Sequence, residues 1–231
     1  MKVRAAHWVV GCVAAGSVAM LAGGLVLAYL DRHAVPAALV SWDFQDVLYQ
    51  VVLMPLPVVG YVLATRRPDN RIGWLFLVAG LALGLQGLAQ QYGLYALVAA
   101  HGSWPAGRAV LWLYNSSLMV PLALLASVFL LFPTGRLRSR RWRPAGWLVA
   151  GTFTLGTAGM LVVATAHWRD PFFTATQAGS SRALGVVLGL TLVALAVSAA
   201  ALVARFVLAR DRKSTRLNSS HYTLSRMPSS A

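Results

Sequence analysis

Glutamate is absent from this 231-residue chain, and its six acidic residues are all aspartate. Charged residues make up only 11% of the sequence, whereas 58% of the residues are hydrophobic. A soluble domain of this size needs far more charge to cover its surface, so the composition excludes an ordinary soluble protein and indicates a membrane protein. The lack of glutamate also leaves paired-carboxylate catalysis with a few scattered aspartates only.

Cysteine and the common catalytic motifs are also scarce or missing. Cys12 is the only cysteine, so no disulfide can form within the chain. The sequence contains no GxxxxGK[ST] phosphate loop, no GxSxG, no HExxH and no CxxC. The histidines have no spacing typical of metal ligands. We therefore expect no catalytic site, no metal and no cofactor in this chain.

Positive charge is what the sequence has in excess. Twenty Lys and Arg residues give a formal net charge of +14, and such an excess is often a sign of nucleic-acid binding. Here the arginines form short clusters between long apolar runs, with no amphipathic basic helix. We therefore expect the lipid bilayer to be the partner and expect no nucleic acid.

The apolar runs are long enough to cross a membrane. About 20 largely apolar residues are needed, because a helix rising 1.5 Å per residue must cross roughly 30 Å of hydrocarbon. The sequence predicts an all-α integral membrane protein in which residues 1–210 form one polytopic domain. Its spans are expected at about 7–30, 46–64, 72–99, 109–132, 145–166 and 183–209.

The placement of Lys and Arg predicts the orientation. Connections with few positive charges contain only Arg32, Arg108, Arg169 and Arg182, and they alternate along the chain with much richer ones. By the positive-inside rule the richer set faces the cytoplasm, which puts both termini inside. The richer set consists of Lys2, Arg4, Arg66, Arg67, Arg71, Arg136, Arg138, Arg140, Arg141, Arg143, Arg210, Arg212 and Lys213.

Prolines and small residues predict details of the packing. Pro55 and Pro57 remove two backbone donors from the second span, so we expect a kink there. Gly80 and Gly84 form a GxxxG step in the third span, and Gly185 and Gly189 form another in the sixth, where Ala196, Ala200 and Ala204 follow. Such steps let helices approach closely, either within one bundle or across a dimer interface.

The polar groups inside the spans are amides and hydroxyls. No Asp, Glu, Lys or Arg falls in the middle of a predicted span, except Arg205 near a cytoplasmic end, where it can reach the headgroups. Gln86 and Gln90 share a face of the third span beside Gln91, and Tyr114, Asn115, Ser116 and Ser117 cluster in the fourth before Pro121. Two interpretations are open: hydrogen bonds that hold helices together, or a polar pocket lined by Gln86, Gln90 and Asn115.

Two segments between spans are more specific than composition. Arg66–Phe76 reads RRPDNRIGWLF, and Phe132–Pro144 reads FPTGRLRSRRWRP. They resemble the N-terminal membrane region of actinobacterial sensor histidine kinases, in which Arg-Pro-x-Asn-Pro-Ile-Gly-Trp opens one span and Phe-Pro-Asp-Gly-Arg-Leu closes another. The resemblance covers about residues 45–210. The chain departs from that pattern at Arg71, where the family has Pro, and at Thr134, where it has Asp.

The resemblance implies a membrane-embedded sensory module whose last helix continues into a cytoplasmic dimerisation and ATP-binding region. It also implies a homodimer through the sixth helix, and a response regulator as partner only if that catalytic half exists. Residues 213–231, KSTRLNSSHYTLSRMPSSA, resemble a translated assembly artefact, so we expect 211–231 to be disordered and non-native, with the kinase truncated before them. A genuine disordered tail is the alternative.

Two other functional classes remain open from the sequence. The first is a small multi-pass transporter or channel subunit, which a cavity lined by Gln86, Gln90 and Asn115 would favour. The second is a structural membrane protein without a ligand. Ion pumps and proton-coupled transporters usually keep an ionisable residue near the bilayer centre. The absence of such a residue here argues against an ion pump and against a proton-coupled transporter.

Overall fold

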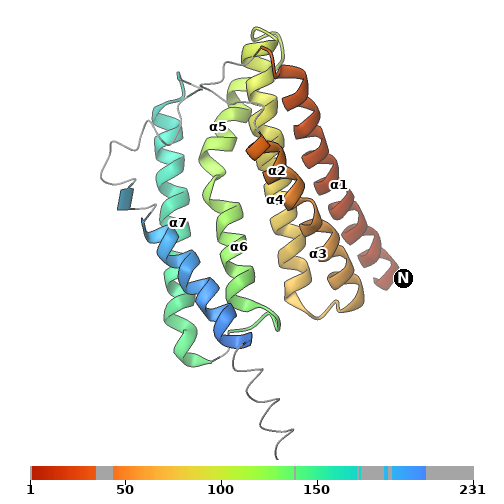
Figure 1. Ribbon diagram of the computed structural model, residues 1–231, viewed down its shortest axis with the longest axis vertical. Helices are drawn as coiled ribbons and strands as arrows, with labels where there is room; N and C mark the ends of the chain where they lie inside the picture. Colours follow the sequence, from red (N-terminus) through yellow and green to blue (C-terminus); the bar gives the residue numbers. More distant parts are fainter. Residues whose placement is uncertain are drawn as a thin grey trace, which may run out of the picture.

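The computed structural model describes residues 2–34, 44–137, 139–170, 172, 185–186 and 189–206, and all regular structure among them is helical (Figure 1). The elements are α1 (Lys2–Asp31), α2 (Phe44–Leu53), α3 (Pro55–Arg66), α4 (Arg71–Leu94), η1 (Tyr95–Ala99), α5 (Gly107–Ser117), α6 (Met119–Leu131), η2 (Arg140–Trp142) and α7 (Arg143–Ala166). An additional helix spans Gly189–Phe206.

Among the residues that the structure describes, five helical segments are long and apolar enough to cross a membrane: His7–Asp31, Arg71–Ala99, Gly107–Leu131, Arg143–Ala166 and Gly189–Phe206. This confirms the predicted all-helical class and indicates a membrane-embedded protein. The second predicted span, 46–64, is covered by α2 and α3, which are both shorter. The total of six spans therefore stays a prediction. The ends of the predicted 183–209 span and the tail 211–231 lie outside the described residues.

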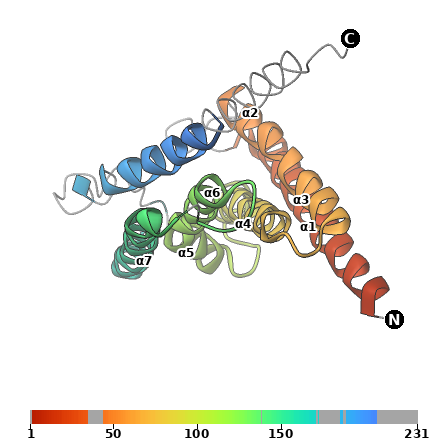
Figure 2. The same ribbon diagram turned by 90° about the horizontal axis from the view of Figure 1, so that it is seen from below.

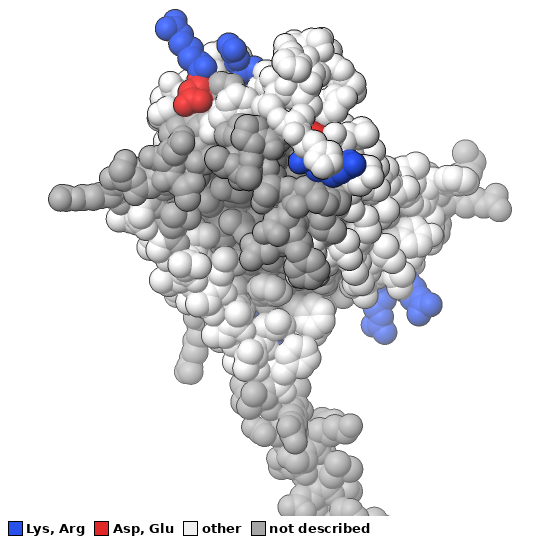
Figure 3. Space-filling view, turned by 45° about the horizontal axis from the view of Figure 1, so that its top comes forward, with Lys and Arg blue, Asp and Glu red and all other residues white. Residues whose placement is uncertain are grey.

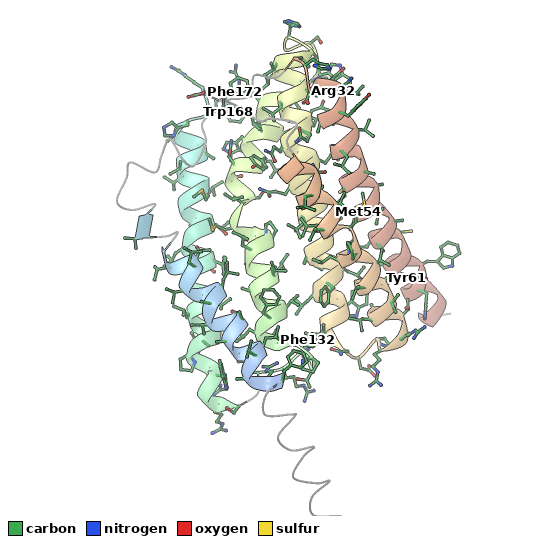
Figure 4. All side chains as sticks on the ribbon, viewed as in Figure 1. Arg32, Met54, Tyr61, Phe132, Trp168 and Phe172 are labelled. Carbon is green, nitrogen blue, oxygen red and sulfur yellow. The ribbon has the colours of Figure 1, made fainter. Side chains whose placement is uncertain are left out.

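Proline breaks the second span where the sequence predicts a kink. Pro55 has no N–H for the carbonyl of Val51, and that carbonyl accepts instead from the backbone N–H of Met54, at 3.2 Å. The helix is interrupted at Met54 and starts again as α3 (Figure 4). Pro57 then lies buried against α4.

A second break, at Leu118, divides Gly107–Leu131 into α5 and α6. Pro121 lies three residues later, and it has no N–H for the carbonyl of Ser117. Its ring also crowds that carbonyl, which bends the helix one turn before the proline. The predicted fourth span is therefore one helical segment made of two pieces.

Helix α4 is the centre of the arrangement. It packs against α1 and α3 on one side and against α5 and α6 on the other, and α7 packs against α5 and α6. Figure 2 shows these two sides in the view from below. The Gly189–Phe206 helix, drawn in blue, crosses α7 obliquely in Figure 1.

Each side has its own apolar cluster. On one side α1, α3 and α4 bury Val10, Ala14, Ala64 and Leu77. On the other side α6, α7 and the Gly189–Phe206 helix bury Met119, Ala126, Leu130, Val149, Phe153, Met160, Ala194 and Ala201. The last helix is therefore packed into the bundle through its small residues.

The helix ends form two opposite groups. The start of α1, the α3–α4 and α6–α7 connections and the end of the Gly189–Phe206 helix lie toward the bottom of Figure 1, and the η1–α5 connection lies at the top. On the face that Figure 3 displays, the charged side chains drawn in colour form small separate groups at the upper left, the upper centre and the lower right. The Arg-rich connections of the sequence thus share one end of the bundle.

The GxxxG step of α4 packs within the chain. A Cβ atom on Gly80 would lie 2.9 Å from Pro57 Cδ, and one on Gly84 would lie 2.9 Å from the backbone oxygen of Ser17. For this step, packing within one bundle is the interpretation that holds. At Gly185 and Gly189 a Cβ atom would meet nothing within 4 Å in the described part of the chain.

Gly73 makes the tightest of these approaches. A Cβ atom there would lie 2.6 Å from the backbone nitrogen of Ala64. We expect Gly73→Ala to lower the stability by about 1–3 kcal/mol through overpacking, measured as thermal unfolding in nanodiscs. Gly151→Ala in α7 is the control, because its Cβ atom would enter open space. Equal unfolding temperatures for the two variants would contradict the close approach of α3 and α4.

Candidate functional site

A cavity of about 240 Å³ lies at the level of the break between α5 and α6, where the two sides of the bundle meet. Helices α1, α2, α4 and α5 all contribute to its wall, and none of the lining residues that the structure describes is charged. The lining consists of Leu21, Gln50, Leu83, Gln86, Gly87, Gln90, Gln91, Tyr114 and Leu118.

Helical periodicity explains why α4 supplies most of the wall. Positions 83, 86–87 and 90–91 recur every three to four residues, so they lie on one face of the helix. Gln86 lies near the middle of the 29-residue segment Arg71–Ala99. In a membrane-spanning segment this position is close to the centre of the bilayer, where a polar side chain must find a partner inside the protein.

Gln50 on α2 projects its amide between glycines. It is 5% exposed, and its Oε1 atom has no hydrogen-bond partner among the described residues. A Cβ atom on Gly24 would lie 3.1 Å from this oxygen, and one on Gly87 would lie 3.9 Å from it. Small residues on α1 and α4 thus make room for a buried acceptor that nothing in the described chain satisfies. Such an atom costs roughly 1–3 kcal/mol until it is paired.

Gln86 bridges α4 to the last turn of α5. Its Nε2 donates to the backbone oxygen of Tyr114 at 3.0 Å, and its Oε1 accepts from the hydroxyl of Ser117 at 2.9 Å. Both partners lie directly before the break at Leu118. The side chain therefore connects α4 to the least regular point of the α5–α6 segment.

The other predicted pocket residues are divided. Gln90 lines the cavity with Gln86, as does Gln91, which is 3% exposed. Asn115 instead lies in a shallow depression beside α7, together with Arg108, Trp112, Ala164, His167, Trp168 and Asp170. The reason is helical geometry: Tyr114 and Leu118 face α4, and Asn115, one residue further round, shares the α7 face with Trp112.

Sequence reasoning did not single out Gln50. A usable signal was present, because Gln50 is a polar residue within the apolar second span. Pro55 and Pro57 predict only a kink in this span. The juxtaposition of Gln50 with Gly24 and Gly87 depends on how three helices pack, which local sequence does not encode.

The two motif segments meet at the Arg-rich end of the bundle. Asn70 caps α4, its Oδ1 accepting from the N–H of Ile72 at 3.0 Å, while its Nδ2 donates to the backbone oxygen of Pro133 at 3.1 Å. Gly135 has a φ of +71°, and a Cβ atom on it would lie 3.0 Å from Arg71 Cβ. Both requirements favour glycine at this position. The turn Phe132–Gly135 is thus fitted against the start of α4.

Arg205 holds the same turn from the other side. From the end of the Gly189–Phe206 helix, its guanidinium donates to the backbone oxygen of Phe132, to that of Leu130 at 2.6 Å and to that of Arg136 at 3.5 Å. The Phe132 and Phe206 rings lie 6.2 Å apart, and Figure 4 labels Phe132 at this junction. Arg205 therefore satisfies carbonyls at the C-terminal end of α6, a more specific role than the expected reach toward headgroups.

The predicted cytoplasmic determinants follow the same grouping. Arg66, Arg67 and Arg71 flank the α3–α4 connection, and Arg136, Arg140 and Arg143 flank the α6–α7 connection; these side chains are all exposed. Arg138 and the side chain of Arg141 lie outside the described residues. Within the described part of the chain, no three His, Cys, Asp or Glu residues form a group that could hold a metal ion.

Substitutions of Asn70 separate its two roles. Asn70→Asp keeps the acceptor that caps α4 but loses the donor to Pro133, whereas Asn70→Ala loses both. We expect a loss of about 1 kcal/mol for Asn70→Asp and about 2 kcal/mol for Asn70→Ala, measured by thermal unfolding. Asp69→Ala, at an exposed neighbour, is the control. If Asn70→Asp behaved like wild type, the bridge between the motif segments would contribute nothing to stability.

Comparisons with protein-family models, with curated proteins and with solved structures find no match to this chain.

Proposed function

We propose that this chain is the membrane-embedded sensory input module of a two-component sensor histidine kinase, with both termini in the cytoplasm and six spans counting α2–α3. The resemblance of Arg66–Phe76 and Phe132–Pro144 to that family supports the kinase assignment. The observation that carries a signalling role is the set of hydrogen bonds from Arg205 to the backbone oxygens of Leu130, Phe132 and Arg136, at the end of α6 and around the turn that follows it. They connect the last described helix directly to the rest of the bundle.

In this proposal the cavity is the input and the Gly189–Phe206 helix is the output. A molecule in the cavity changes the partners available to Gln86, which bridges α4 to the break at Leu118. The bend between α5 and α6 then changes, and α6 ends in the turn that Arg205 holds. A sensor of this kind needs two arrangements of similar free energy, and a helix that is already broken by proline can supply them at low cost.

The outward face of the last helix is where we place the homodimer. Ala196 and Ala200 are exposed in the single chain, whereas Ala194 and Ser198 are 0% exposed, and Ala194 belongs to the apolar cluster with α6 and α7. Small residues on the exposed face allow the close helix approach that drives association in lipid.

Cysteine cross-linking in native membranes tests this dimer. In a Cys12→Ser background, we expect Ala196→Cys and Ala200→Cys to give disulfide-linked dimers on mild oxidation. Ala194→Cys and Ser198→Cys are the matched controls and should stay monomeric. A monomeric pattern at all four positions would contradict a dimer through this helix.

The kinase assignment has a separate test. If the genomic reading frame continues beyond residue 212 into a dimerisation and ATP-binding region, the assignment is supported. A native stop codon directly after Ala231 would contradict it.

A small transporter or channel subunit is the second candidate. The uncharged polar cavity near the middle of Arg71–Ala99 favours it, because transport sites commonly lie at this depth. Solute flux in proteoliposomes distinguishes the two candidates. Flux that Gln86→Leu abolishes would favour transport over sensing.

A further inference from the structure

We propose that the cavity binds a small uncharged molecule with a hydrogen-bond donor and an apolar face, contacting Gln50, Gln90 and Gln91 on its polar side. This inference deepens the proposed sensory function, since such a molecule would be the stimulus. Binding of this molecule does not require a signalling response, and a transport site would bind it equally.

The described part of the cavity wall is polar but uncharged. It consists of four glutamines, one tyrosine, three leucines and a glycine, and none of these described residues carries a charge at neutral pH. A charged ligand entering this site would lose its hydration without gaining a counter-charge. That cost is severe at the depth of a membrane-spanning segment. The chemistry of the wall therefore selects a neutral occupant.

Gln50 Oε1 is a buried acceptor without a partner in the described chain, so the occupant must present an N–H or O–H group to it. The side chains of Gln90 and Gln91 also line the cavity and make no hydrogen bond to other described residues. Amides both donate and accept, so the occupant gains most from carrying both kinds of group.

Leu21, Leu83 and Leu118 form an apolar part of the wall, which favours a molecule with one apolar face. A cavity of about 240 Å³ filled at the density of a protein interior holds roughly ten non-hydrogen atoms. The competing occupant is water, of which about eight molecules would fit at the volume per molecule of the liquid.

Benzamide and its charged isosteres provide the probes. Benzamide is neutral, has an N–H donor, a carbonyl acceptor and an apolar ring, while benzoate and benzamidinium have nearly the same shape with opposite charges. Equilibrium dialysis of each labelled compound against the full chain in nanodiscs, with empty nanodiscs as background, measures binding. We expect saturable binding of benzamide at least tenfold tighter than that of either ion.

Three variants locate the binding. Gln50→Met keeps the shape but removes the acceptor, and it should weaken benzamide about tenfold, the cost of one buried hydrogen bond. Gly87→Ala adds a methyl group whose nearest atom is Gln50 Oε1 at 3.9 Å, so it should narrow the cavity without a clash. Asn115→Leu changes an amide of the same bundle that lies outside the cavity, and it should leave binding unchanged.

Each other outcome overturns the inference. Absence of saturable binding above the empty-nanodisc background would mean that the cavity holds only water, and equal saturable binding of all three probes would mean that the site does not select a neutral molecule. An effect of Asn115→Leu as large as that of Gln50→Met would place the site elsewhere. None of these results bears on cross-linking at Ala196 and Ala200, so the sensory proposal and the ligand class fail independently.

Discussion

Arg205→Met is expected to destabilise the chain by about 3 kcal/mol and to loosen the last helix from α6. The guanidinium donates to three backbone oxygens around the end of α6, and hydrogen bonds from a charged donor contribute about 1.5–3 kcal/mol each. Methionine has a similar length but no donor, so carbonyls at the end of α6 lose their partner. The measurement is thermal unfolding in nanodiscs.

The sign of this effect separates two roles for Arg205. If the side chain only reached toward headgroups, replacing a charge at the end of a span with an apolar residue would be neutral or stabilising. Arg140→Met removes one charge from an exposed position at the same end of the bundle and should change the unfolding temperature little. An Arg205→Met variant as stable as Arg140→Met would contradict the role of Arg205 in holding the turn.

Gln86→Leu is expected to cost about 1–3 kcal/mol, because it leaves the oxygen of Tyr114 and the hydroxyl of Ser117 without their partner on α4. Gln90→Leu is a closely matched control. It lies one turn further along α4, lines the same cavity and makes no hydrogen bond to another described residue. We expect it to be neutral or slightly stabilising in the same unfolding assay.

This pair of variants also tests the proposed route of the signal. If Gln86 connects the cavity to the break at Leu118, then with no ligand added Gln86→Leu should alter the cross-linking pattern of Ala196→Cys and Ala200→Cys, and Gln90→Leu should not. The same stability and the same pattern in both variants would show that the bridge has no special part in the bundle.

The local rules of sequence predict much of this fold. Apolar length locates the long helices and proline chemistry locates the break at Met54, since side-chain hydropathy and the missing N–H of proline are both local properties of the sequence. The GxxxG step of α4 has two interpretations in the sequence, and only the positions of Pro57 and Ser17 in space select packing within the chain.

The candidate site is less predictable, for a physical reason. The spacing of Gln86 and Gln90 is enough to place them on the same face, because they belong to one helix. Asn115 comes from a different helix, and its rotation about the helix axis decides whether it faces α4 or α7. Gln50 depends on two glycines of other helices, and Arg205 on the course of a turn some 70 residues earlier. Such contacts arise only when the helices are assembled.

Accessibility of single cysteines on intact cells tests the central claim most directly, namely that the Arg-rich connections lie together on the cytoplasmic side of a membrane. In a Cys12→Ser background, a membrane-impermeant thiol reagent should label Ser103→Cys, in the η1–α5 connection, from outside. Asp69→Cys and Ser139→Cys, in the α3–α4 and α6–α7 connections, should react only after permeabilisation. Labelling of Asp69→Cys or Ser139→Cys on intact cells, with Ser103→Cys protected, would contradict the account.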